Sequence, residues 1–291
     1  MIEKIKTRIA AMAINRWDRD VPLSPDGERY WFMGGGDTVC RPFHYRWLIP
    51  ALCKQSRLRW RACAELSTAL LIPAAILMLL VYGVPLYAAV GGGLCVFGLS
   101  GVWRFNRDVP VLVDAPAMLL VVISVTFIHL PYYFWPIAVI AILVAGCVKE
   151  TSPVFAAAIA WNPLLLIGLI APLIRKLRIA EGEDVVFNPD AIHAIYHPYD
   201  AGMKSHSHMW TDWKIMLAPW GGLVLASLHL SFPLMATLLL AYGTLVIATD
   251  TIRLYQWAWP AVLIAAFSLP PVFWGPIILL TLFNPYKGSG A

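Results

Sequence analysis

The sequence predicts an all-α fold, a polytopic bundle of eight or nine transmembrane helices, and three observations support this prediction. Apolar residues make up 59% of the 291 residues, and charged residues make up only 13%. The mean hydropathy is +0.69, whereas a soluble domain has about 25% charged residues. The Lys and Arg residues lie almost wholly between long apolar runs, as in membrane proteins. Disordered, coiled-coil, collagen-like and disulfide-rich secreted proteins are excluded, because none combines so much apolar mass with so few charges.

The elements follow from the apolar runs in chain order. Residues 1–19 are basic, and their apolar stretch is shorter than a signal-peptide core, so we expect a helix lying in the membrane interface. Runs of roughly 17 to 25 apolar residues predict spans, here residues 62–84, 85–103, 111–130, 131–148, 152–174, 215–232 and 233–249. Residues 254–283 suit two short spans or one helical hairpin. Prolines predict tight turns between paired spans, at Pro85, Pro131, Pro233 and Pro270.

This pattern divides the chain into four parts. Residues 1–61 form an interfacial segment, residues 62–174 hold the first five spans, residues 175–214 form a polar loop, and residues 215–291 hold the remaining spans. Crossing a bilayer requires neither hydrophilic segment, so chemistry is expected there. Similar numbers of Lys and Arg flank the spans on the two sides, which leaves the orientation open. The five cysteines are scattered and predict no disulfide or metal site.

Acids, arginines and aromatic residues alternate near the end of the first segment. The chain reads Pro25-Asp26-Gly27-Glu28-Arg29-Tyr30, then Gly34-Gly35-Gly36-Asp37, then Arg41-Pro42-Phe43-His44-Tyr45-Arg46-Trp47-Leu48-Ile49-Pro50. Composition alone leaves two interpretations: a solvated loop with an aromatic membrane anchor, or a polar site. The three glycines suit either a flexible turn or a close approach of the backbone to a ligand.

The order of these residues resembles the first extramembrane loop of bacterial polytopic glycosyltransferases of the GT-C type, which use polyprenyl-phosphate sugars. Further short motifs follow in the family's order: Val113-Asp114-Ala115, Lys149-Glu150-Thr151, Pro219-Trp220-Gly221 and Asp250-Thr251-Ile252-Arg253-Leu254. Each motif is short, and their order over most of the chain gives the resemblance its weight. The family usually has a transmembrane helix ahead of this loop, whereas no predicted span precedes Asp26.

The resemblance implies a GT-C-like helical arrangement and an inverting transfer of a sugar from a polyprenyl-phosphate donor to an acceptor hydroxyl. By this match Asp26 is the general base that takes the hydroxyl proton, and Asp37 is the reserve. A phosphate leaves without being protonated, so one carboxylate suffices, unlike in glycoside hydrolysis. Cations stabilise the departing phosphate, and the candidates are Arg46, Lys149, Arg29 and Arg104. Supporting positions are Glu28, Tyr30, His44, Tyr45, Glu150, Asp114 and Arg253.

Several of these residues also have simpler interpretations. Arg46 suits lipid headgroup binding or snorkelling as well as donor binding. Lys149 and Glu150 form either a phosphate-binding turn or a boundary ion pair. Asp114 should face the bundle interior, or else it caps a helix. Arg253 follows an acid at helical spacing, which allows a local pair, and the span count places it on the side opposite Asp26.

The second polar segment contains the one candidate metal edge. His193 and His197 are four residues apart and would share a helix face, but no cysteine accompanies them. We therefore expect no metal site and no required cofactor, with a divalent cation as the one additional ligand that the sequence allows. The expected partners are a polyprenyl-phosphate sugar, membrane lipid and an acceptor glycan, lipid or protein, with no nucleic acid. The expected location is the bacterial cytoplasmic (inner) membrane. Two other functions stay open, a carrier or flippase for a lipid-linked sugar and a non-catalytic membrane assembly protein.

Overall fold

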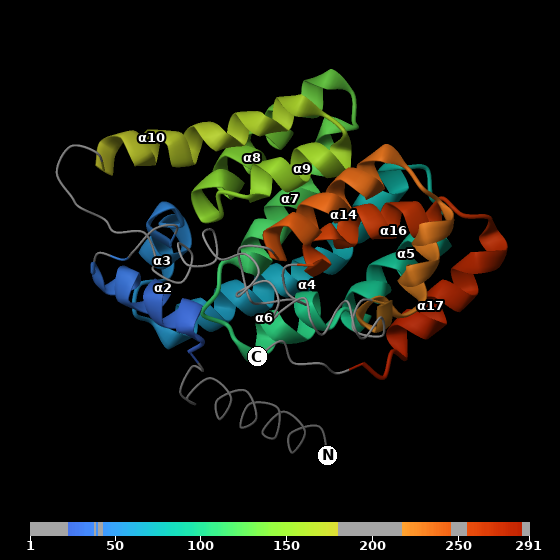
Figure 1. The fold of residues 1–291 in the computed structure, drawn as a ribbon, viewed down its shortest axis with the longest axis horizontal. Helices are drawn as coiled ribbons and strands as arrows, with labels where there is room; N and C mark the ends of the chain where they lie inside the picture. Colours follow the sequence, from blue (N-terminus) through green and yellow to red (C-terminus); the bar gives the residue numbers. More distant parts are fainter. Residues whose placement is uncertain (1–22, 38, 40–42, 180–216, 246–254, 287–291) are drawn as a thin grey trace, which may run out of the picture.

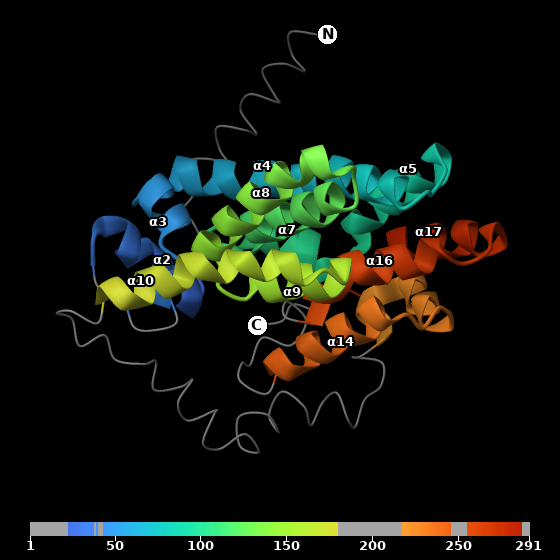
Figure 2. The same cartoon turned by 90° about the horizontal axis from the view of Figure 1, so that it is seen from above.

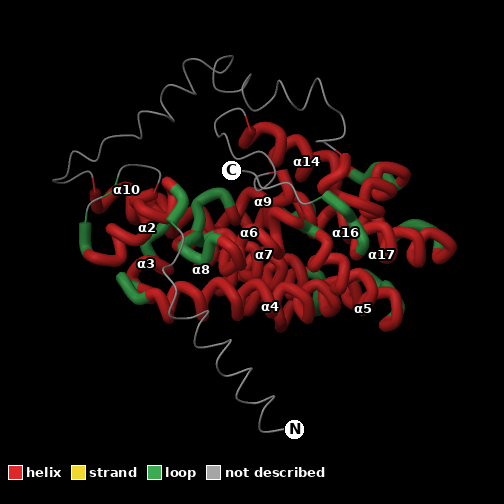
Figure 3. Tube along the Cα trace, turned by 90° about the horizontal axis from the view of Figure 1, so that it is seen from below, coloured by secondary structure: helices red, strands yellow, loops and turns green. Residues whose placement is uncertain are grey.

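The computed structural model describes residues 23–37, 39, 43–179, 217–245 and 255–286, and within these residues every regular element is a helix (Figures 1 and 3). This confirms the all-α prediction for the described part of the chain. The predicted interfacial helix at residues 1–19 lies outside it, as do His193, His197 and Arg253.

The amino-terminal polar segment folds into short helices. These are α2 (Pro25–Gly35), η1 (Phe43–Tyr45) and α3 (Leu48–Cys53). Ser24 caps α2, because its side-chain oxygen accepts a hydrogen bond from the Gly27 amide at 3.1 Å. Gly36 ends the helix with a φ of 101°, a conformation that glycine adopts without strain. A Cβ on Gly34 would lie 2.8 Å from the Lys54 backbone, so the absent side chain allows α2 to pack against α3.

The remaining helices form the bundle. They are α4 (Arg57–Val81), α5 (Leu86–Cys95), η2 (Val96–Gly98), the π-helical η3 (Ser100–Arg104), α6 (Phe105–Asp108), α7 (Asp114–Ile128), η4 (Tyr132–Phe134), α8 (Trp135–Val148), α9 (Ser152–Ala160), η5 (Pro163–Leu169), α10 (Ile170–Ile179), η6 (Ala218–Leu228), α14 (Phe232–Leu245), η7 (Gln256–Ala258), α16 (Trp259–Phe267), η8 (Pro271–Phe273) and α17 (Trp274–Leu282). Seen from above, α4 and α5 run along one side, α7 and α8 lie in the middle, and α14 lies on the other side (Figure 2).

One predicted span is wrong. Residues 152–174 are not a single helix, because α9 ends at Trp161, which adopts a left-handed φ of 50°. Asn162 then caps the next helix by accepting a hydrogen bond from the Leu164 amide at 3.0 Å. The chain doubles back, so that η5 packs on α9 and α10 reaches η1. An apolar run with an uncharged turn has the same hydropathy as one continuous span, so hydropathy could not predict this reversal.

Two other predicted apolar runs also fold differently from one straight helix. Within the predicted run at residues 254–283, the described residues 255–283 form a helical hairpin, one of the two predicted forms, from η7 and α16 followed by η8 and α17. Residues 85–103 belong to a broken element, because the helices at Leu86–Gly98 and Ser100–Asp108 meet at an angle of 69°. Among the described residues, α4 is long and apolar enough to cross a membrane, and the bent pair is a second candidate. The count of eight or nine spans stays a prediction, since the other apolar helices have 10–17 residues.

Glycine allows two passes of the bundle to touch. A Cβ on Gly146 of α8 would lie 2.1 Å from the carbonyl oxygen of Gly168, so the two backbones need this small residue. We expect Gly146→Ala to lower the free energy of unfolding by about 1–3 kcal/mol through overpacking, measured by thermal unfolding of the purified protein. Gly243→Ala is the control, because no atom lies within 4 Å of its Cβ position. An equal loss in both variants would contradict this interpretation.

Candidate functional site

Charged side chains from separate parts of the chain meet at the end of the bundle where α2 and α3 lie. They come from α2, from the link between η1 and α3, from the first residue of α7 and from the turn between α8 and α9. We call this set the ion-pair cluster, and its members are Asp26, Arg29, Arg46, Asp114, Lys149 and Glu150. All six were candidate site residues from the sequence.

Arg46 is held by a bidentate ion pair. Its Nε and Nη2 atoms donate to the two carboxylate oxygens of Glu150 at 2.7 and 2.6 Å, and Nη1 donates to the hydroxyl oxygen of Tyr30 at 2.7 Å. Only 12% of the Arg46 side chain and 21% of the Glu150 side chain are exposed. Paired guanidinium and carboxylate groups of this geometry are among the strongest hydrogen bonds in proteins. Arg46 therefore joins the amino-terminal helices to the α8–α9 turn.

The same contacts shift the ionisation of these groups. Burial alone would raise the pKa of Glu150, but the adjacent Arg46 charge outweighs it and holds that pKa below its usual value. Burial likewise opposes the charge on Arg46, and Glu150 reverses the effect, so the pKa of Arg46 lies well above its ordinary value. Burial raises the pKa of Tyr30, and its hydroxyl stays neutral at physiological pH. The pair is therefore fully ionised near neutral pH.

A second ion pair lies deeper in the bundle. Lys149 Nζ donates to Asp114 Oδ1 at 2.5 Å, and the Trp257 indole N–H donates to the same oxygen at 3.1 Å. The Lys149 nitrogen also lies 4.6 Å from the centre of the Trp257 ring, a cation–π contact. Exposed fractions are 6% for the Lys149 side chain and 3% for that of Asp114. This confirms that Asp114 faces the interior, and no side-chain cap bond begins α7.

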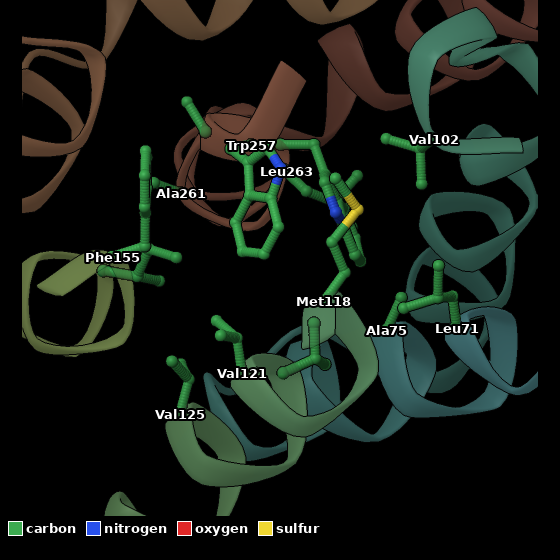
Figure 4. Close-up of a cluster of buried hydrophobic side chains, with 14 of the residues drawn as sticks. Leu71, Ala75, Val102, Met118, Val121, Val125, Phe155, Trp257, Ala261 and Leu263 are labelled. Atoms are coloured by element: carbon green, nitrogen blue, oxygen red, sulfur yellow. The ribbon is translucent and has the colours of Figure 1, made fainter. Parts of the chain in front are cut away.

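Trp257 contacts both Asp114 and Lys149, and the sequence analysis did not identify it as a site residue. It lies in η7, directly before α16. Its ring centre is 5.4 Å from that of Phe155 in α9. Figure 4 shows it among apolar side chains of α7, α9 and α16, including Met118, Val121 and Leu263. Nothing distinguishes it in the sequence, because one of 13 tryptophans in an apolar run looks like lipid-facing or core material.

Asp26 lies at the more open edge of the cluster. Its carboxylate is 3.6 Å from Arg29 Nη1, and about a quarter of each side chain is exposed. The Arg29 guanidinium is 4.7 Å from the centre of the Phe43 ring, and the Arg46 guanidinium is 5.2 Å from the same centre. Tyr30 packs edge-on against that ring at 5.4 Å. Phe43 therefore connects the Asp26–Arg29 pair to the Arg46–Glu150 pair.

The other predicted residues lie apart from these contacts or outside the described part. Asp37 and Glu28 are exposed, and Tyr45 is half-buried. Arg104 is exposed and pairs with Asp108 at 3.4 Å within its own helical segment. His44 belongs to η1, but its side chain lies outside the described part, as do Arg253 and both histidines of the candidate metal edge. Within the described residues, no group of three or more His, Cys, Asp or Glu side chains is placed to hold a metal ion.

The Arg46 contacts give a direct stability test. We expect Arg46→Lys to lower the free energy of unfolding by about 1.5–3 kcal/mol, because a lysine cannot supply the planar fork that reaches both Glu150 oxygens and Tyr30. The measurement is thermal unfolding in detergent at neutral pH. Arg59→Lys is the control, since Arg59 is exposed and its guanidinium donates to the nearby Leu52 carbonyl over a long 3.4 Å. Equal stability of the Arg46→Lys protein and the native protein would show that the fork contributes nothing.

Comparisons with protein-family models, with curated proteins and with solved structures find no match to this chain.

Proposed function

We propose that the chain is an integral membrane glycosyltransferase that moves a sugar from a polyprenyl-phosphate donor to an acceptor hydroxyl, with Asp26 as general base. The position of Asp26 supports this most. Its carboxylate is partly exposed, it lies 3.6 Å from Arg29, and it belongs to the same cluster as the two more buried ion pairs. Inverting displacement needs this combination, a base for the incoming hydroxyl and a cation for the departing phosphate.

The roles of the cations differ in this proposal. Arg29 is the donor-phosphate contact, because its side chain is partly exposed beside Asp26. Arg46 and Lys149 already neutralise Glu150 and Asp114 in buried pairs. They act as positioning residues, holding α2 and η1 against the bundle, and direct phosphate binding by them would require Glu150 or Asp114 to give up its partner. In this proposal Arg46 and Lys149 position the site, and Arg29 binds the phosphate of the donor lipid.

Membrane embedding is part of the proposal. Large apolar side chains are exposed on many helices, among them Leu66, Tyr132, Leu239 and Leu280, at 60–78%. A soluble protein seldom exposes apolar surface on this scale. Helices of 10–17 residues reach about 15–26 Å, less than the ~30 Å hydrocarbon core. We therefore expect the bilayer to thin locally around a multi-pass bundle, in the bacterial inner membrane.

The experiment that tests the proposal identifies the lipid and then the reaction. Mass spectrometry of lipid that co-purifies with the protein should detect a polyprenyl phosphate or its sugar adduct. Membranes containing the protein are next supplied with polyprenyl-phosphate hexoses, and release of free polyprenyl phosphate is followed. A bound lipid-linked sugar that crosses vesicle membranes without release would favour a carrier or flippase. Absence of both the lipid and turnover would remove the enzyme proposal.

A further inference from the structure

Charged residues are absent from five long stretches of the sequence, and in each stretch the chain reverses once between two helical segments. No Asp, Glu, Lys or Arg occurs in residues 66–103, 115–148, 151–174, 215–249 or 254–286. All 22 Lys and Arg residues fall between or before these stretches or after the last of them. Each stretch leaves a charged segment, reverses at an uncharged turn and returns to a charged segment. The uncharged turns are residues 82–85, 129–134, 161–163, 229–231 and 268–273.

Ring contacts join the first of these turns to the second and the last, and the third turn to the fourth, and we call the region that holds the five turns the charge-free end. Tyr82 of the first turn packs on His129 of the second at 4.6 Å, and its hydroxyl reaches the His129 ring. Tyr87 beside the first turn packs on Trp274 beside the last at 5.9 Å. Trp161 of the third stacks on Phe232 beside the fourth at 6.0 Å. The turns lie away from α2 and α3, towards α5 and α17 (Figure 1).

The opposite end carries the ion-pair cluster and exposed cations. Exposed basic residues flank the amino-terminal helices and α6, namely Lys54, Arg57, Arg59, Arg104 and Arg107. The last helix before residue 180 also returns to this end, because α10 contacts η1. If residues 152–174 formed one span, the end of α10 would lie on the other side, and similar numbers of Lys and Arg would flank the spans on the two sides. With the reversal at Trp161, every described cation belongs to one end.

We infer that the bundle inserts with the ion-pair cluster at the cytoplasmic face and the charge-free end towards the opposite face. Short loops rich in Lys and Arg stay on the cytoplasmic side of a membrane, where anionic headgroups also attract basic residues. Exposed aromatic side chains such as Tyr132, Tyr133 and Phe232 suit the far interface, where the described part of the chain places no cation. The inference rests on the membrane embedding in the proposed function and is independent of sugar transfer. The donor phosphate would then be engaged in the cytoplasmic leaflet.

Reporter fusions to the full chain test the orientation. Residues 283–286 follow α17 at its end away from the uncharged turn at 268–273, and Asn284 donates to the Ala218 carbonyl at the start of η6, the end of η6 away from its own uncharged turn. A fluorescent protein that folds only in the cytoplasm, fused after Ala291, should therefore be bright, and alkaline phosphatase at the same position should be inactive. A dark fluorescent fusion together with an active phosphatase would overturn the orientation.

Labelling with a membrane-impermeant maleimide gives a second, local measurement, read against the native chain as baseline. Ser268→Cys places a thiol at an exposed position in the charge-free end, and Gln55→Cys places one at an exposed position between α3 and α4. In intact spheroplasts we expect labelling of the first variant, and labelling of the second only after lysis. The reverse pattern contradicts the inference.

Different results would contradict the membrane orientation and the glycosyltransferase activity. Extraction of the chain from membranes by alkaline carbonate, with both fusions cytoplasmic, would remove the embedding and the orientation together. An oriented chain that releases no polyprenyl phosphate would leave the orientation standing and remove the glycosyltransferase.

Discussion

Asp26→Asn is expected to slow sugar transfer by about 10²- to 10⁴-fold, the usual contribution of a general base. Asparagine has almost the shape of aspartate but cannot take the acceptor's proton. Asp26 lies in the first turn of a helix that Ser24 caps, so the substitution should leave α2 in place. The measurement is the initial rate of polyprenyl-phosphate release from a polyprenyl-phosphate hexose, at equal protein content in membranes.

Two other acids complete this experiment. Asp108→Asn is the matched control, because Asp108 is exposed and pairs with the exposed Arg104 and Arg107 of its own segment at 3.2–3.4 Å. Pairs of that kind contribute little, so its rate should stay near that of the native protein. Asp37→Asn tests the reserve base. Full turnover in Asp26→Asn with loss in Asp37→Asn would move the base to Asp37, and full turnover in both would end the general-base mechanism.

Asp114→Ala should lower the free energy of unfolding by about 3–5 kcal/mol, the cost of leaving one member of a buried ion pair without its partner. Lys149 is 4% exposed and its main counter-ion would be gone. The Trp257 N–H would lose its acceptor as well. The effect is measured by thermal unfolding in detergent, and it should appear as lost folded protein even before activity is assayed.

The double variant Asp114→Leu with Lys149→Met separates the causes. Removing both charges leaves no stranded ion, and apolar replacements of buried pairs are often tolerated. We therefore expect the double variant to regain most of the stability that either single variant loses. If the double variant is as unstable as Asp114→Ala, the loss arises from packing around Trp257 and not from an unpaired charge.

The candidate site was largely visible in the sequence as a set of residues. The order of short motifs that resembles the GT-C family singles out Asp26, Arg46, Asp114, Lys149 and Glu150, and the structure brings them into one cluster. Their pairing was not visible. Lys149 and Glu150 are neighbours in the chain, yet each has a partner from another segment, 35 and 104 residues away. Adjacency in sequence does not reveal which side chains face each other across helices.

The sequence by itself determined the helical class and which charged residues require partners, because hydrophobic burial and the cost of a lone charge act on composition and local pattern. Only the tertiary structure decided where the chain turns and which charges meet. The reversal at Trp161 and Asn162 involves no charged residue, so hydropathy is the same on both sides of it. Packing and backbone geometry alone place α10 beside η1, and that placement gathers the described charges at one end of the bundle.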